Sequence, residues 1–213
     1  MQTDTVEDDH PTGIGQPLAD LVGRGLAVPC LDGRERPYRD LDCAASTPAL
    51  RTVADRVVSF LPEYSSVHRG AGYKSRAATA AYEAARARIL EFAGRPAGDV
   101  AVICRNTTEA INHLAYRIPF AADAVVATTV VEHHANLLPW ARVARRRYVE
   151  CGPDGMFGVE DVVAALDERP VPALLALTGA SNVTGWLPPV EAICEAAHER
   201  GVPVALDAAQ LAP

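Results

Sequence analysis

The sequence predicts an α/β protein, a three-layer α/β/α sandwich built on a mostly parallel sheet. Beyond Asp99, short apolar runs of strand length alternate with helical segments, a rhythm typical of βαβ units. The runs are continuously apolar rather than alternating, so both faces of each strand are expected to be buried. With 213 residues, 49% hydrophobic and 22% charged, the chain can bury one sizeable core.

The first 64 residues are predicted to form two segments outside the main sheet. Residues 1–20 are polar and carry several Pro and Gly residues, so a mobile N-terminal arm is expected there. Residues 21–64 are expected to contain a short strand near 38–42 and one helix. That helix is predicted to begin with Thr47 as N-cap and to run to about Phe60, because Pro48 suits the first helical position.

Residues 65–213 are predicted to form the large, ligand-binding domain. Its first helix carries one apolar stripe, from about 75 to 93, and is expected to end at Gly94. Further helices are expected at 107–116, 136–145, 159–167 and 189–200. Strands are expected at 100–104, 124–129, 147–150, 173–178 and 202–206.

Charge and composition narrow the class of protein. The net charge of -7 argues against a nucleic-acid partner, whose binding surface is basic. Five scattered cysteines without a C-x-x-C pair indicate reduced thiols rather than a disulfide framework or a zinc site, so no metal is expected. No run of 18 apolar residues occurs, which argues against a membrane segment. A cytoplasmic protein is predicted.

The last predicted strand brings Asp207 to its C-terminal end, and Gln210 follows three residues later. Ligands of open α/β sheets bind outside the carboxyl ends of the strands. A carboxylate is costly to bury unless a cationic group meets it, and the protonated ring nitrogen of pyridoxal phosphate is one such group. The alternative is an Asp that caps the next helix or begins a turn.

Three more polar motifs follow predicted strands. Thr107 and Thr108 stand at a helix start, where free N–H groups suit a phosphate, although an ordinary N-cap explains them equally. His133 has a flat ring that can stack on an aromatic cofactor or cap the next helix. Asn182 can bind a phenolic oxygen of a cofactor or serve as a turn residue. Because all four motifs fall at strand ends, one shared site is favoured.

Taken together, these motifs resemble those of class V aminotransferases, the fold-type-I pyridoxal-phosphate family that includes cysteine desulfurases. The E-H-H-A-N-x-x-P-W string is the most specific of them, and the matches span residues 41–213. In order along the chain they are L-D-C-A-A-S-T-P at 41–48, V-H-R-G at 67–70, N-T-T-E-A-I-N at 106–112, E-H-H-A-N-L-L-P-W at 132–140, S-N-V-T-G at 181–185 and D-A-A-Q at 207–210.

The resemblance implies a role for each candidate residue. Thr107 and Thr108 are expected to hold the cofactor phosphate, and His133 to stack on the pyridine ring. Asn182 and Gln210 are expected to face the phenolic oxygen, and Asp207 to pair with the ring nitrogen; His133 and Asp207 are the residues expected to take part in catalysis. His68 and Arg69 lie in a loop that, in similar enzymes, approaches the active site across a homodimer interface.

One feature of such enzymes falls outside this sequence. They hold the cofactor as a Schiff base on a lysine about twenty residues beyond the Asp-x-x-Gln motif, whereas the only lysine here is Lys74. The chain is therefore expected to be the N-terminal portion of a transferase or lyase acting on an amino acid or amine through a pyridoxal-phosphate aldimine, and to be inactive by itself. The alternative is a non-catalytic relative that serves binding or regulation. Asn106 in place of a glycine and Cys43 in place of an asparagine are further departures from the family pattern.

Overall fold

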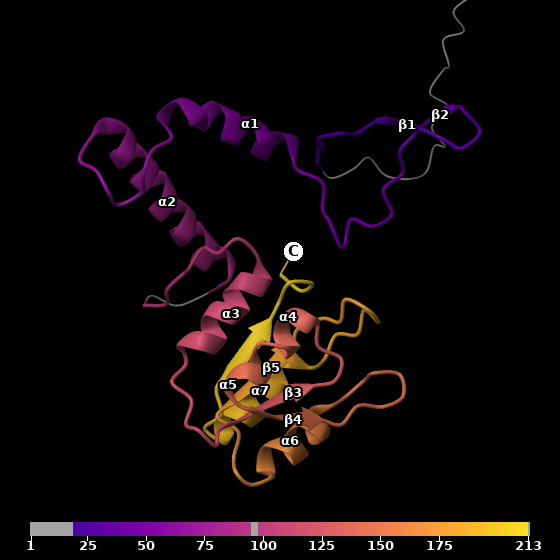
Figure 1. Cartoon of the computed structure of the whole chain (residues 1–213), viewed down its shortest axis with the longest axis vertical. Helices are drawn as coiled ribbons and strands as arrows, with labels where there is room; N and C mark the ends of the chain where they lie inside the picture. The colour runs from indigo at the N-terminus through magenta and orange to yellow at the C-terminus, as the bar shows by residue number, and fades with distance from the viewer. Residues whose placement is uncertain (1–18, 95–97, 213) are drawn as a thin grey trace, which may run out of the picture. The chain divides into compact units, whose positions relative to one another are not determined.

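The structure, a computed structural model, describes residues 19–94 and 98–212 (Figure 1). The chain divides into two compact units, residues 1–101 and 102–213, called unit 1 and unit 2 below. The arm predicted over residues 1–20 falls almost wholly outside the described residues. The predicted boundary between residues 64 and 65 stays a prediction.

Unit 1 begins with a small antiparallel hairpin, β1 (Ala27–Pro29) and β2 (Glu35–Pro37). The predicted strand at 38–42 is wrong, because the residues that pair lie at 35–37 and the chain after them is irregular. Gly33 closes the hairpin with a φ of +76°, a conformation that glycine adopts without steric cost.

The remaining regular elements of unit 1, among the described residues, are helical. They are α1 (Arg51–Phe60), the 3₁₀ turn η1 (Leu61–Glu63) and α2 (Tyr73–Phe92). The predicted α2 and its end beside Gly94 are confirmed, but α1 begins three residues later than expected, at Arg51 rather than Pro48. Thr47 is not its N-cap, because the Thr47 hydroxyl donates instead to the carbonyl of Cys43 at 2.9 Å.

Unit 2 is built on a four-stranded sheet with the strand order β4-β3-β5-β6, in which every pairing is parallel. The two central strands are buried along their whole length, as their apolar sequences predict. Arginines on the edge strand β4 discourage pairing with another chain. The strands are β3 (Val125–Thr129), β4 (Arg145–Val149), β5 (Leu174–Thr178) and β6 (Val204–Asp207).

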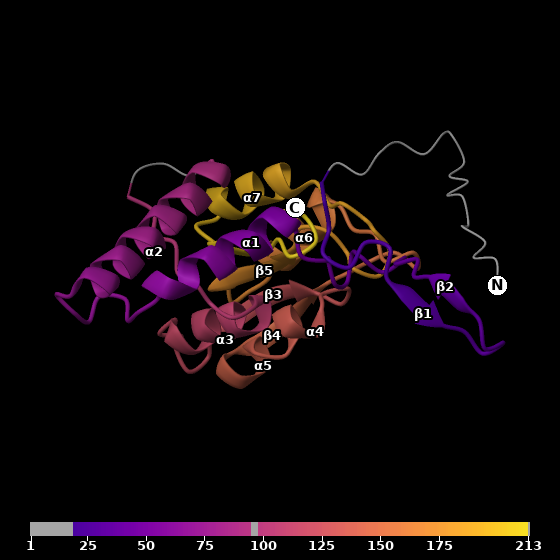
Figure 2. The same cartoon turned by 90° about the horizontal axis from the view of Figure 1, so that it is seen from above.

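Helices cover both faces of this sheet, so the predicted three-layer α/β/α fold is confirmed (Figure 2). Alternate residues of β5 point to opposite layers: Leu175 and Leu177 pack against α6 and α7, whereas Leu174 and Ala176 pack against α3 and α5. The helices are α3 (Thr107–Arg117), α4 (His134–Leu137), α5 (Trp140–Val143), α6 (Val159–Asp167) and α7 (Val190–Glu199).

Two predicted elements of this region are wrong. The apolar run at 100–104 forms no strand, because no described residue pairs with it, and Val100 and Val102 are 69% and 76% exposed. The single helix expected over 136–145 is two short helices. Pro139 lies between them, and proline lacks the N–H that a continuous helix requires.

No helix within residues 19–94 and 98–212 is both long enough and apolar enough to span a bilayer.

Candidate functional site

The carboxyl ends of β3, β5 and β6 lie side by side, because the strands are parallel and in register. Thr178 at the end of β5 pairs with Asp207 at the end of β6, and Gly179 N–H donates to the Asp207 carbonyl at 2.8 Å. A side chain at position 179 would meet Leu211 at 2.8 Å, so glycine permits this close approach. This edge is where open α/β sheets bind ligands.

Asp207 is buried at this edge, with 8% of its surface exposed. Its Oδ1 accepts a hydrogen bond from the N–H of Ala209 at 3.1 Å, which is the turn role considered as the alternative. Across the described chain, no arginine, lysine or histidine forms an ion pair with it. A buried carboxylate without a cation suits a ligand that brings a positive charge, such as a protonated ring nitrogen.

The first turn of α3 reaches the same edge, because α3 leads into the start of β3 and so runs antiparallel to the strands. Asn106 is its N-cap, with Oδ1 accepting from Glu109 N–H at 2.9 Å. Glu109 accepts in turn from Arg105 N–H at 2.7 Å and from the Arg105 guanidinium at 2.9 Å. This hydrogen bonding to Arg105 lowers the pKa of the Glu109 carboxyl.

The cap therefore uses Asn106 rather than either threonine. In the described hydrogen bonding, the hydroxyls of Thr107 and Thr108 take no part in the cap. A hollow of about 480 Å³ lies beside this turn, and its lining residues are Arg105, Asn106, Thr108, Glu109 and Asn112. Hydroxyls and helix N–H groups at such a turn are suitable donors to a phosphate.

His133 precedes α4 and caps it, as the alternative interpretation proposed. Its Nδ1 accepts a hydrogen bond from Ala135 N–H at 3.1 Å, which leaves Nε2 as the nitrogen that carries the ring proton in this arrangement. The ring is exposed, and it lies tilted by 45° against His134 with 6.2 Å between centroids. This cap holds the ring in place and leaves the ring exposed, so a flat ligand can still stack on it.

Asn182 and Gln210 are both exposed, in the turns that follow β5 and β6. The Ser181 hydroxyl holds the first turn by accepting from Val183 N–H at 3.2 Å and Thr184 N–H at 3.1 Å. Asn182 thus lies in a turn whose backbone is held by Ser181. The contact of Asn182 and Gln210 with a cofactor oxygen stays a prediction.

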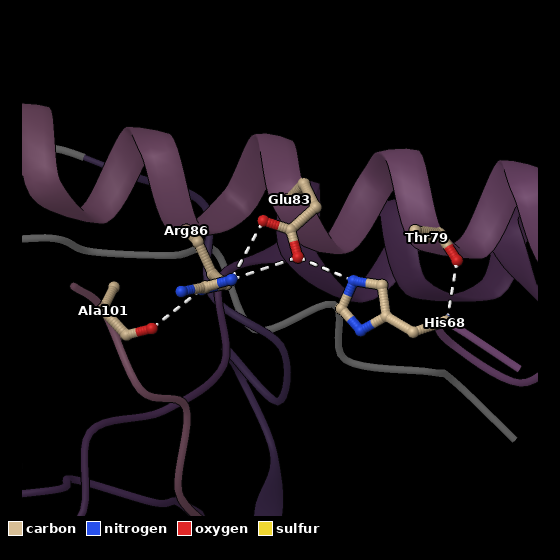
Figure 3. Close-up of polar contacts among 5 residues, drawn as sticks. All are labelled: His68, Thr79, Glu83, Arg86 and Ala101. Carbon is tan, nitrogen blue, oxygen red and sulfur yellow. Dashed lines mark hydrogen bonds and ion pairs between the residues drawn. The ribbon is translucent and has the colours of Figure 1, made fainter.

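His68 and Arg69 belong to unit 1, where His68 is held on α2 (Figure 3). His68 has a φ of +58°; its N–H donates to Thr79 Oγ1 at 2.9 Å, and its Nε2 lies 2.8 Å from Glu83 Oε1. Arg86 also binds Glu83 and donates from Nε to the Ala101 carbonyl at 2.8 Å. Arg69 is exposed. Their approach to an active site across a dimer stays a prediction.

Comparison with known proteins identifies the family to which the chain belongs. A family model described as aminotransferase class-V matches residues 40–213. The chain belongs to the class-V aminotransferase family. This confirms the resemblance noted from the sequence motifs.

Relatives of this member of the class-V aminotransferase family include several proteins named cysteine desulfurase. One from Haloferax volcanii is 31% identical over 98% of this chain and 52% of its own length. Another, from Pectobacterium atrosepticum, is 39% identical over 82% of this chain and 45% of its own length. The chain thus spans about half the length of the curated relatives it matches.

Solved structures agree with the fold of this class-V chain. An apo cysteine desulfurase from Thermococcus onnurineus NA1 gives a TM-score of 0.71 at 26% identity, over 78% of this chain and 42% of that one. The cysteine desulfurase CsdA from Escherichia coli gives a TM-score of 0.65 at 31% identity, over 79% and 44% of the two chains.

Sequence reasoning about this class-V chain missed Glu132, which received no role. Glu132 is 6% exposed, and its carboxylate binds Thr129, Asn136 and the backbone of Thr178. The available signal was local: an acidic residue lies three positions after a predicted buried strand and directly before the candidate His133. Its contact with Thr178, 46 residues away, carries no signal in a single sequence.

Proposed function

We propose that this chain forms the cofactor-binding part of a pyridoxal-phosphate-dependent enzyme that acts on an amino acid. The observation that carries the proposal is Asp207, a buried carboxylate without a cationic partner among the described residues. It stands at the carboxyl edge of a parallel sheet in a member of the class-V aminotransferase family. Pyridoxal phosphate, when bound, serves as an electron sink for bonds broken at the substrate α-carbon.

The residues at this edge have complementary roles in the proposal. Asp207 would pair with the ring nitrogen and so keep it protonated. Thr107 and Thr108, with the first N–H groups of α3, bind the phosphate. His133 presents its ring to the flat face of the cofactor, and Asn182 and Gln210 orient the phenolic oxygen.

The substrate follows from the relatives rather than from the geometry. Because proteins of this family at 31% and 39% identity are named cysteine desulfurases, cysteine is the first substrate to test. Aminotransferase, lyase and epimerase activities are the alternatives. The proposal includes a cytoplasmic homodimer, in which the His68–Arg69 loop approaches the partner's site, and a Schiff-base lysine supplied by residues beyond this sequence.

The proposal is tested by loading the complete protein with pyridoxal phosphate and recording visible absorption. We expect the wild type to bind the cofactor and Asp207→Asn to bind it at least tenfold more weakly, because a neutral amide cannot pair with a ring cation. Asp123→Asn is the matched control, since Asp123 is exposed before β3, at the opposite edge of the sheet.

Three results would contradict the proposal. A complete protein that stays colourless after loading would favour a non-catalytic relative used for binding or regulation. Equal cofactor affinity of the Asp207→Asn and Asp123→Asn proteins would remove Asp207 from the site. Coloured protein that turns over neither cysteine nor any other amino acid would contradict the enzymatic part.

A further inference from the structure

Glu132 is a buried carboxylate that the proposed chemistry leaves unused. It lies in the turn between β3 and α4, directly before His133, and 6% of its surface is exposed. No described arginine, lysine or histidine forms an ion pair with it. A carboxylate in such a place has to be stabilised by hydrogen-bond donors instead.

Three donors from three elements supply that stabilisation. The Thr129 hydroxyl at the end of β3 and the Thr178 N–H at the end of β5 each donate to Oε1 at 2.9 Å. Asn136 of α4 donates from Nδ2 to Oε2 at 2.7 Å. Glu132 thus joins the turn that carries His133 to both central strands at the edge where Asp207 lies.

The orientation of this network is fixed by Trp140. Its indole Nε1–H, which can only donate, bonds to Asn136 Oδ1 at 3.3 Å, so the amide of Asn136 presents its NH₂ group to Glu132. The Thr178 N–H can only donate as well. The Thr129 hydroxyl is the one member that can reverse its role, so a proton on Glu132 fits at Oε1, directed to Thr129 Oγ1.

The charge of Glu132 changes near neutral pH. Burial raises the pKa of its carboxyl to about 7. The three hydrogen bonds act in the opposite direction and lower the pKa, whereas the nearby Asp207 carboxylate raises it slightly further. The other titratable groups around it are His133 in its own turn, His134 at the start of α4, and Cys151 after β4, whose pKa is raised chiefly by burial and to a lesser extent by Glu132.

The two central strands and α5 supply no further titratable group beside Glu132. Neither β3 nor β5 contains a titratable side chain, and the only one on α5, Arg142, is exposed.

We propose that Glu132 is a positioning residue whose carboxylate fixes the His133 turn to the end of β5. Protonation of Glu132 weakens this fixation, because hydrogen bonds to a neutral carboxyl are weaker than hydrogen bonds to a carboxylate, although the proton removes the cost of burying the charge. The inference rests on the proposed function, because it assigns His133 and Asp207 to one cofactor site. It predicts that the alignment of the His133 ring with that site depends on the charge of a residue that touches neither substrate nor cofactor. His133 itself stays capped on α4 in both states, since its Nδ1 bonds to Ala135 rather than to Glu132.

The first test needs no cofactor. In the complete protein, the indole 15N–1H signal of Trp140, assigned by its loss in Trp140→Phe, is followed from pH 5.5 to 9. We expect it to titrate within about a unit of pH 7, because Asn136 relays the charge of Glu132, and to stay fixed in Glu132→Gln. The Trp186 signal serves as the internal control, since its Nε1 has no hydrogen-bond partner among the described residues.

A Trp140 signal that stays constant in the wild type would overturn the proposal, as would a titration that persists in Glu132→Gln. If Glu132→Gln fails to fold, a Trp140 signal that stays constant in the wild type still overturns the proposal.

The second test measures pyridoxal-phosphate affinity at pH 8 and pH 6. Glutamine offers one acceptor oxygen, so either Asn136 or Thr178 loses its partner, and we expect affinity about tenfold lower than wild type at pH 8. The ratio is expected to shrink at pH 6, where the wild type also carries the proton; titration of the cofactor itself cancels in the ratio. The control is Glu195→Gln, an exposed position on α7.

The outcomes separate this inference from the proposed function. If the wild type binds the cofactor and Glu132→Gln binds it as tightly as Glu195→Gln does, the positioning role is wrong while the proposed function stands. An affinity ratio that is equal at both pH values contradicts the role of the proton. A protein that binds no cofactor contradicts the proposed function, and the positioning role with it, whatever the Trp140 signal does.

Discussion

The two units of this chain are stabilised in different ways. Among the described residues, every buried hydrophobic side chain except Ala78 belongs to unit 2, where two clusters fill the spaces on either side of the sheet. In unit 1, α1 buries none of its residues, and Leu61 and Phe92 are 59% and 79% exposed. Unit 1 instead shows polar contacts at the surface, such as the group around Glu83 in Figure 3.

This difference indicates which unit can hold a functional side chain in one fixed position. In unit 2, buried strands bring Asp207 and Glu132 to fixed positions, and packing in a dense core resists displacement. In unit 1, His68 is held by groups that water also reaches, and such contacts contribute little because solvent competes for them. The proposed cofactor residues accordingly belong to unit 2, whereas the His68–Arg69 loop is the more adaptable part.

The largest contrast is expected for apolar truncations. Leu177 is fully buried in β5, and Leu177→Ala should lower the free energy of unfolding of unit 2 by about 4 kcal/mol, since it removes buried surface and leaves a cavity. Leu61→Ala in unit 1 is the matched control and should cost less than about 0.5 kcal/mol. Native-state hydrogen exchange measures both, and similar losses would show that the two units do not differ in this way.

The next effect is a pH dependence confined to unit 2. The folded pKa of Glu132, about 7, lies above its ordinary value of 4.5, so the folded state binds a proton more tightly than the unfolded state. The resulting stabilisation is complete below about pH 4.5 and is lost as pH rises to about 7, a change of about 3 kcal/mol. Urea unfolding of the wild type and of Glu132→Gln measures it; parallel pH profiles would contradict the assignment.

Helix capping gives a smaller contrast. Asn106 caps α3 through its side chain, whereas α1 begins at Leu50 without a side-chain cap. Asn106→Ala should therefore lower stability by about 1 kcal/mol and loosen the turn that carries Thr107 and Thr108, while Leu50→Ala removes no capping bond. Amide exchange in the first turn of each helix reports the effect. Equal protection in the wild type and in Asn106→Ala would show that the cap is dispensable.

The sequence was sufficient for most of unit 2, because its signals are local. The pattern of α6 predicts the residues Val159–Asp167 that the structure contains, and the apolar runs predict β3 and β5 to within a residue. Each of these elements carries its own periodicity and meets a core on the face that periodicity indicates. Three of the four motifs follow the observed strands β3, β5 and β6, whereas the motif at 106–109 follows no strand, because the run at 100–104 is irregular.

The errors occurred where structure depends on distant residues or on very short elements. The β1–β2 hairpin has three-residue strands, too short to show alternation, although Asp32-Gly33 is a recognisable hairpin turn. The run at 100–104 is apolar like a strand, yet a strand also requires a neighbour. Glu132 escaped notice because its role depends on Thr178, which only the folded sheet brings beside it.

The smallest effect tests whether unit 1 depends on its surface charges. Glu83→Gln keeps the size of the side chain but removes the charge that faces His68 and Arg86. The three side chains are between 27% and 53% exposed. We expect a loss below about 1 kcal/mol, seen as faster exchange of the His68 amide and reproduced in the wild type by high salt. Glu91→Gln, in a pair that is 70% to 80% exposed, should change less. A loss as large as that of Leu177→Ala would mean that unit 1 relies on this ion pair as unit 2 relies on its core.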